Sequence, residues 1–217
     1  MGKQNSEVRL VVFDLGRVLV RICDNWQHAC RVAGLPVVEG ELSAEGQARL
    51  HALVCRAEVG ALGMDGFARE VAPVLGITPV QLRALSDAYL LGAHEGAIEV
   101  VDELSTAGMP TACLTNTNDN HWRLMSDRSA PAYFPLGRLT HQFASHLLRL
   151  RKPEEAIYAH VERATATPPH AILFFDDIEE NVAAARKRGW DARRIDPALD
   201  DPISQVRDAL REHRIVD

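Results

Sequence analysis

Short apolar runs that end abruptly in polar residues limit what this chain can fold into more than any other feature. Each run is rich in β-branched or aromatic side chains, which is typical of strands buried on both faces, the usual state of a strand in a parallel sheet. The runs and the polar residues that follow them are 9–13 with Asp14, 110–114 with Thr115 and Asn116, and 171–175 with Asp176 and Asp177.

Helical patterns alternate with these runs. Amphipathic or capped segments predict helices at 97–107, 118–126, 152 onward, 179–188 and 201 onward. Two weaker apolar segments, 141–145 and 191–195, predict further strands. Strands that alternate with helices imply an α/β fold, with a Rossmann-like parallel sheet and helices on both faces.

The segment 22–92 departs from this alternation, because it contains no convincing strand. We predict four helices in it, at 24–33, 43–59, 65–75 and 78–90. Thr78, Pro79 and Gln81 match the start of the last helix, with a capping residue, proline in the first turn and a capping-box partner. We therefore expect a helical-bundle cap domain, 22–92, inserted into a core domain made of 1–21 and 93–217.

Composition restricts the partners of the protein. The chain has 217 residues, enough for one core and an insert, and its net charge of −6 argues against a nucleic-acid surface. No apolar run approaches the ~20 residues that cross a bilayer, and the polar start, 1–7, does not resemble a signal peptide. The four cysteines lack metal-ligand spacing and fit reduced thiols. We expect a cytoplasmic protein that binds neither nucleic acid nor membrane, of unknown oligomeric state.

The polar residues that end the strands suggest a common site. Carboxyl ends of neighbouring parallel strands meet at one edge of the sheet, where open α/β sheets bind ligands. Lys152 can reach the same edge from the start of its helix. Carboxylate oxygens favour Mg²⁺, while Lys152 and Thr115 suit phosphate oxygens. Asp14 would then be placed to attack phosphorus and form an aspartyl-phosphate.

These motifs resemble those of the haloacid dehalogenase (HAD) superfamily of hydrolases, in the same order and over nearly the whole chain. They are Phe13-Asp14-Leu15-Gly16-Arg17-Val18, Leu114-Thr115-Asn116-Thr117-Asn118, Lys152-Pro153-Glu154, and Phe174-Phe175-Asp176-Asp177 with Asn181. The segment 22–92 resembles the α-helical cap that closes over the site in that superfamily and selects the substrate. The first motif is most similar to a branch of sugar-phosphate phosphatases that reads D-L-G.

The resemblance implies a magnesium site. Asp14 would be both the nucleophile and a ligand, and the backbone carbonyl of Gly16 and the carboxylate of Asp177 would be further ligands. Asp176 would act directly or through water. We expect Asn181 to lie on a helix surface or to pin the loop, and not to be a ligand.

The resemblance also implies a phosphate site. Thr115 and Asn116 would bind the phosphoryl group, and Lys152 would steady both that group and Asp14. Arg17 stands where the family usually has a small or uncharged residue. It either points into the site and pairs with an anionic substrate or turns outward to solvent.

Gly16 is the departure with chemical consequences. Most phosphatases of the superfamily have an Asp there, which protonates the leaving oxygen and later activates water, and such assistance is worth about 10²–10⁴-fold. Three explanations stay open. The substrate has a good leaving group, as in a sugar-1-phosphate or an acyl or aryl phosphate; another acid such as Asp24 replaces the missing one; or activity is reduced or lost.

We therefore expect a magnesium-dependent phosphatase acting on a small phosphorylated metabolite. One alternative is a haloacid dehalogenase acting without metal, although the adjacent Asp176 and Asp177 are costly without a cation. Another is a catalytically impaired binding or regulatory protein with this fold. Possible pocket-lining residues are Trp26, His28, His94, His121 and Trp122.

Overall fold

The central sheet of the computed structural model has five parallel strands in the order β5-β4-β1-β6-β7. The strands are β1 Leu10–Phe13, β4 Thr111–Thr115, β5 His141–Ala144, β6 Ile172–Asp176 and β7 Asp191–Arg194. The structure describes residues 8–37 and 42–216, so the polar start, 1–7, lies outside the described residues. The predicted α/β class with a parallel sheet is confirmed.

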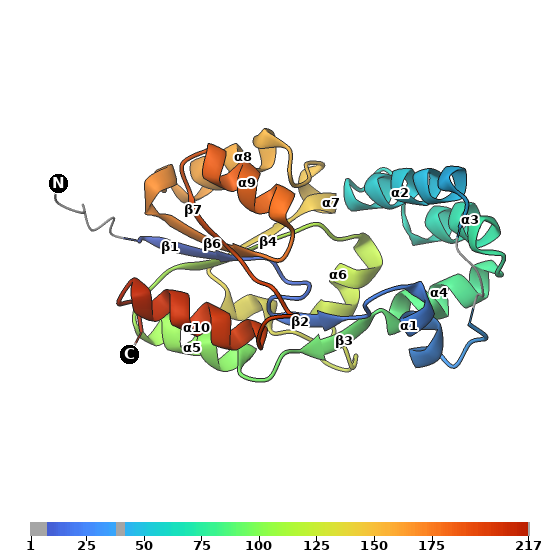
Figure 1. Ribbon diagram of the computed structural model, residues 1–217, viewed down its shortest axis with the longest axis horizontal. Coiled ribbons are helices and arrows are strands. Elements are labelled where there is room, and N and C mark those ends of the chain that lie inside the picture. The colour runs from blue at the N-terminus through green and yellow to red at the C-terminus, as the bar shows by residue number, and fades with distance from the viewer. Residues whose placement is uncertain (1–7, 38–41, 217) are drawn as a thin grey trace.

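Helices cover both faces of the sheet (Figure 1). Helices α5 Ala97–Thr106 and α10 Pro202–Glu212 lie on one face, and α8 Glu155–Thr165 and α9 Glu179–Lys187 on the other. Strand β1 supplies both cores, because its side chains alternate. Val11 and Phe13 pack in one apolar cluster, whereas Leu10 and Val12 pack in the other. This two-sided burial is why the run that forms β1 is apolar throughout.

The segment after the first motif forms a helical bundle to one side of the α/β layers (Figure 1). Its helices are α1 Trp26–Val32, α2 Ala44–Glu58, α3 Met64–Leu75 and α4 Pro79–Ala88. The bundle has an apolar core of its own, which includes Leu53, Phe67 and Val71. The capping box of Thr78 and Gln81 is present at the start of α4, as predicted.

A two-stranded antiparallel ribbon connects the bundle to the sheet, and the prediction of no strand within 22–92 is wrong there. Strands β2 Val20–Ile22 and β3 Leu90–Ala93 pair with one another, where the sequence predicted a helix reaching residue 90. The partners lie about 70 residues apart in the chain, and Arg21 donates a side-chain hydrogen bond to the Leu91 carbonyl. When short strands this far apart in the chain pair, the pairing produces no pattern among neighbouring residues that would predict it.

The remaining elements are short or begin slightly later than predicted. Helix α8 begins at Glu155 and not at Lys152, because a residue that precedes proline is disfavoured in the helical region. Helix α6 Asp119–Ser126 uses Asn118 as its cap. Besides β2 and β3, the described elements that were not predicted are α7 Ser145–Leu148 and two 3-10 turns, η1 Leu136–Arg138 and η2 Pro169–Ala171.

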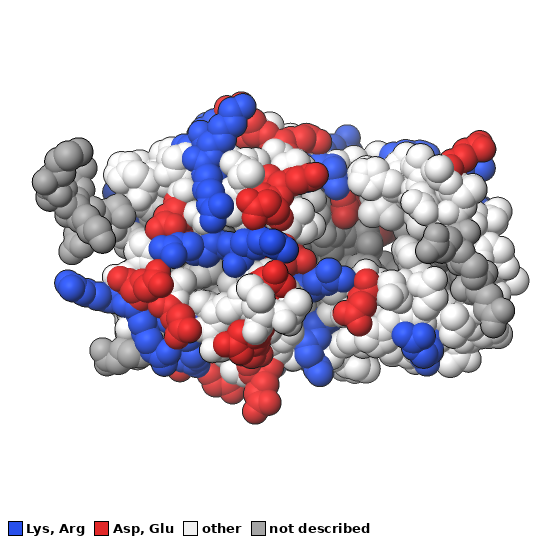
Figure 2. Space-filling model, in the orientation of Figure 1, with Lys and Arg blue, Asp and Glu red and all other residues white. Residues whose placement is uncertain are grey.

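Two surface properties bear on partners. In the described part of the chain no helix is both long enough and apolar enough to cross a membrane. On the face in Figure 2, acidic and basic side chains intermingle over the α/β layers, and the helical bundle carries fewer charges. The cytoplasmic location and the absence of a nucleic-acid partner stay predictions.

Candidate active site

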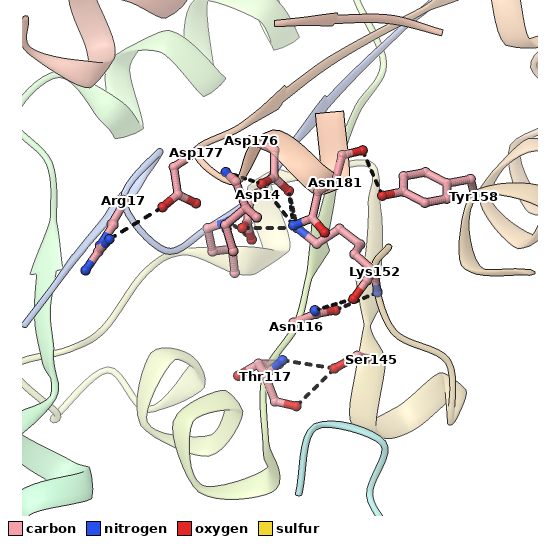
Figure 3. Close-up of polar contacts among 12 residues, drawn as sticks. Asp14, Arg17, Asn116, Thr117, Ser145, Lys152, Tyr158, Asp176, Asp177 and Asn181 are labelled. Carbon is pink, nitrogen blue, oxygen red and sulfur yellow. Dashed lines mark hydrogen bonds and ion pairs between the residues drawn. The ribbon is translucent and has the colours of Figure 1, made fainter. Parts of the chain in front are cut away.

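Three carboxylates gather at the carboxyl edge of the sheet (Figure 3). Asp14 follows β1, Asp176 ends β6, and Asp177 is the next residue. The parallel register of Phe13 with Phe175 brings the two strand ends together. As a result, one oxygen of each carboxylate lies within 4.8 Å of the other two. The motifs along the sequence predict this gathering.

Lys152 lies completely buried between two of these carboxylates. Its Nζ is 3.0 Å from Asp14 Oδ2 and 2.6 Å from Asp176 Oδ2. Asp176 also accepts hydrogen bonds from the Asn181 side chain and from the Ile178 backbone N–H. Every oxygen of Asp176 therefore already has protein donors, so this residue holds Lys152 in place. Asn181 is buried and pins the loop; the alternative of a surface position is wrong.

The electrostatics of the cluster favour a bound cation. The pKa of Asp14 is raised to about 7, first because the carboxyl is buried. The ammonium of Lys152 opposes this shift, and the carboxylates of Asp176 and Asp177 add to it. Burial and the Asp176 carboxylate likewise raise the pKa of Asp177, and the Arg17 guanidinium opposes this shift. Like charges this close are unfavourable unless a positive charge joins them. Carboxylate oxygens are ligands that Mg²⁺ prefers.

Lys152 itself keeps its proton. Burial works to lower its pKa, but the neighbouring carboxylates of Asp14 and Asp176 outweigh burial and raise it above the ordinary lysine value. A charged Lys152 beside Asp14 can neutralise phosphate oxygens brought to that carboxylate.

Thr115 and Asn116, the two residues of the second motif expected at the site, have different surroundings. Thr115 is buried at the end of β4 and lines the cavity described below. Asn116, which we expect to bind phosphate, also lines this cavity, and its side chain clamps the backbone of Lys152. Its Nδ2 donates to the Lys152 carbonyl, and its Oδ1 accepts from the Lys152 N–H, both at 2.9 Å. Because both polar ends of the amide are engaged there, the side chain positions Lys152.

Ser145 is a supporting residue that sequence reasoning missed. Its hydroxyl is fully buried, accepts from the Thr117 N–H at 2.9 Å and donates to the Thr117 carbonyl at 3.1 Å. It holds the loop after β4 next to the loop after β5. A signal was present, since Ser145 stands at the carboxyl end of a strand, as Asp14 and Thr115 do.

Gly16 is not required by the backbone of its turn. It does not have a positive φ, and a Cβ placed on it would meet only the Ile22 side chain, at an ordinary contact distance of 3.5 Å. The turn therefore has room for a Cβ at this position, beside Asp14. The missing acid is a property of the sequence that the fold does not demand.

Arg17 turns toward the site (Figure 3). Its Nη1 lies 3.8 Å from Asp177 Oδ2, and its Nη2 donates to the Asp24 backbone carbonyl at 3.1 Å. Of the two alternatives for Arg17, the inward one agrees with these contacts. Asp24 does not replace the missing acid, because its side chain is 77% exposed and faces His28.

A cavity of about 470 Å³ lies between the carboxyl edge and the helical bundle. Its floor includes Asp14, Thr115 and Asp177, and its walls include Trp26 and His121. The other suggested lining residues in the described chain, His28, His94 and Trp122, do not contribute to it. At its rim Arg151 donates two hydrogen bonds, of 3.0 and 2.8 Å, to Glu58 of α2, so one ion pair joins the bundle to the loop of Lys152.

A parallel sheet with this strand order, an acidic carboxyl edge and a helical insert after the first strand is the fold of the HAD hydrolases. Comparison with solved structures confirms the predicted resemblance at the level of the fold. A predicted HAD-like family hydrolase from Porphyromonas gingivalis is 24% identical, and the match covers 94% of this chain and 98% of that chain with a TM-score of 0.75.

Two other solved structures have different ligands or activities. A HAD family enzyme from Bacteroides thetaiotaomicron, in complex with magnesium and inorganic phosphate, is 20% identical over 89% of this chain and 96% of that chain, with a TM-score of 0.71. An L-2-haloacid dehalogenase from Xanthobacter autotrophicus is 20% identical over 87% of this chain and 77% of that chain, with a TM-score of 0.62. No family model matches the sequence.

Proposed function

We propose that this protein is a magnesium-dependent phosphatase that hydrolyses a small phosphorylated metabolite through an aspartyl-phosphate on Asp14. The observation that carries the proposal is the buried contact of Lys152 with Asp14 in a cluster of three carboxylates beneath a cavity. The magnesium and phosphate bound by the Bacteroides enzyme of the same fold agree with it.

Asp14 has the surroundings of a nucleophile. Its Oδ1 accepts the Leu15 N–H at 2.7 Å, and its Oδ2 contacts Lys152, so the carboxylate is held in one orientation. Asp14, Asp177 and the Gly16 carbonyl would hold Mg²⁺, which when bound neutralises charge on the phosphoryl oxygens. Thr115 and Lys152 bind the other phosphoryl oxygens, and Arg17 adds a positive charge at the edge of the cavity.

The reaction needs two displacements at phosphorus. In the first, an Asp14 oxygen forms a bond to phosphorus, and the leaving oxygen departs with its electron pair. In the second, water attacks the same phosphorus, releases inorganic phosphate and restores the Asp14 carboxylate. The net reaction consumes one water and yields an alcohol and phosphate.

The dehalogenase alternative is less consistent with the charges of this site. Asp14 would then attack carbon without a metal, and Asp176 and Asp177 would stay close together without a neutralising cation. An adjacent acidic pair of this kind is unfavourable. We expect no halide release from 2-haloacids in chelator.

The test is phosphate release from p-nitrophenyl phosphate and acetyl phosphate, with Mg²⁺ and with chelator. We expect release that chelator abolishes and that Asp14→Asn lowers by at least about 10³-fold, the scale for loss of a covalent nucleophile. Asp24→Asn is the matched control, because that carboxylate lies outside the cavity. Equal release with and without Mg²⁺, or by Asp14→Asn, contradicts the proposal, and no release at all favours the binding or regulatory alternative.

A further inference from the structure

We infer that the substrate is an aryl phosphate, whose ring lies against the wall of the cavity opposite Asp14 and which leaves as a phenolate. This rests on the phosphatase function proposed above and specifies its substrate class. Two independent observations carry it: the chemistry of the cavity wall and the glycine at position 16, which leaves no acid at the usual position beside Asp14.

The cavity wall formed by the helical bundle and by α6 is aromatic. Trp26 and Tyr89 have ring centroids 5.8 Å apart, and Tyr89 stacks on His121 with centroids 6.0 Å apart and planes only 6° apart. Phe67 of α3 and Val54 of α2 extend the same wall. Burial lowers the pKa of His121, so its ring is neutral and adds no charge. Flat apolar surfaces of this kind favour a flat apolar ligand.

Two polar side chains that line the cavity, Ser86 and Glu58, already have partners. Ser86 Oγ lies 3.2 Å from His121 Nε2 and also accepts from Asn120, and Glu58 is occupied by Arg151. A sugar brings several hydroxyl groups, and each one left without a partner on burial costs about 1–3 kcal/mol. An aromatic ring brings none.

Two polar groups of the wall do stay free. Among the described residues, the Tyr89 hydroxyl and the Trp26 indole N–H have no hydrogen-bond partner in the structure. They can meet a polar substituent on the ring.

Among the described residues, the candidates considered for a leaving-group acid are not placed to protonate the leaving oxygen. Gly16 has no side chain, Asp24 faces away from the cavity, and His121 is held by the Ser86 carbonyl at 3.0 Å. A phenol ionises near pKa about 10, as tyrosine does, against about 15.7 for water. When the bond from phosphorus to an aryl oxygen breaks, that oxygen keeps the electron pair, and the phenolate takes its proton from solvent.

The first experiment measures kcat/KM with Mg²⁺ for a series of para-substituted phenyl phosphates of similar size. We expect kcat/KM to fall by about tenfold or more from the most acidic phenol to the least acidic, because no acid compensates. Gly16→Asp, which the turn has room for, should flatten this dependence. A flat dependence in the unchanged protein overturns the inference.

The second experiment tests the wall. Trp26→Ala should lower kcat/KM for phenyl phosphate by about tenfold, the scale of an aromatic contact. The same variant should lower kcat/KM for acetyl phosphate much less, since that substrate has a good leaving group but no ring. Trp122→Ala is the matched control, because Trp122 lies outside the cavity. Equal losses on both substrates, or faster turnover of glucose-1-phosphate than of phenyl phosphate, overturn the inference.

The two proposals fail in different ways. Magnesium-dependent hydrolysis of acetyl phosphate that requires Asp14 supports the phosphatase function whatever the ring experiments give. If acetyl phosphate and every phenyl phosphate resist hydrolysis, both proposals are wrong. If acetyl phosphate is hydrolysed and Trp26→Ala has no effect on phenyl phosphate, only the substrate class is wrong.

Discussion

Asp14 is a residue whose position suits chemistry but lowers the stability of the folded state. Burial and two neighbouring carboxylates raise the pKa of its carboxyl to about 7, and the ammonium of Lys152 opposes this shift only in part. A group whose charged form is disfavoured by the fold lowers the stability of the folded state at every pH where it must ionise.

Asp14→Asn should therefore stabilise the metal-free protein. In the folded state Asp14 binds its proton more tightly than in the unfolded state, whose value is near 3.8. The metal-free protein thus loses stability as the pH rises from about 4 to about 7, and an amide avoids this loss. We expect a melting temperature at pH 8 at least about 3 °C above that of the unchanged chain. The difference should shrink at pH 4, and a lower melting temperature at pH 8 contradicts the argument.

Asn116 acts through Lys152, so its removal should damage the site without unfolding it. Asn116→Ala deletes two hydrogen bonds to the Lys152 backbone. Loss of a supporting residue of this kind typically costs about 10–100-fold in activity. We expect kcat/KM for p-nitrophenyl phosphate to fall by that amount, with the circular dichroism spectrum retained. An unchanged kcat/KM would show that Lys152 does not need the clamp.

Among the elements, a single acidic residue joins three segments on one face of the sheet. Glu162 of α8 accepts hydrogen bonds from Arg188, which ends α9, and from the Trp190 indole N–H, which precedes β7. Burial acts to raise the pKa of Glu162, but the hydrogen bonds from Arg188 and Trp190 outweigh burial and lower the pKa. The charged form therefore stabilises the fold.

Glu162→Ala should lower the free energy of unfolding by about 2 kcal/mol near pH 7, the range for hydrogen bonds to a charged group. Since the folded pKa lies below the unfolded value of 4.5, this contribution is complete above that value. It is lost as the pH falls through the folded pKa. Urea unfolding at pH 7 and at pH 3 measures both effects. A cost that is the same at both pH values argues that only packing is lost.

In the molecule as a whole, the site lies where two separately packed parts meet. The α/β layers and the helical bundle have different apolar clusters, and the ribbon of β2 and β3 joins them beside the cavity. The carboxylates come from the sheet, and the aromatic wall comes largely from the bundle. A ligand that neutralises the carboxylates should therefore stabilise the whole fold.

Mg²⁺ should raise the melting temperature in a pH-dependent way. At a concentration 100 times its dissociation constant a ligand adds about 2.7 kcal/mol of stability. Because protonation of Asp14 competes with the cation, the stabilisation at a given Mg²⁺ concentration should decrease as the pH falls below about 7. Asp14→Asn should lose most of the shift, and Asp24→Asn should keep it. A shift that both variants retain would place the cation elsewhere.

Patterns among neighbouring residues were enough to predict much of the fold and several residues of the site. The apolar runs of β1, β4 and β6, the residues that end them, and the Thr78 capping box are patterns within a few neighbours. Parallel strands then bring their carboxyl ends to one edge, so the meeting of Asp14 with Asp176 and Asp177 followed from the pattern alone.

What the sequence did not reveal depends on partners that are distant in the chain. The pairing of β2 with β3, the clamp of Asn116 on Lys152, the inward turn of Arg17 and the outward turn of Asp24 all depend on which groups the fold places side by side. A buried polar side chain forms hydrogen bonds with the groups that the fold places beside it. Those groups, and the burial itself, are set only when the chain has folded.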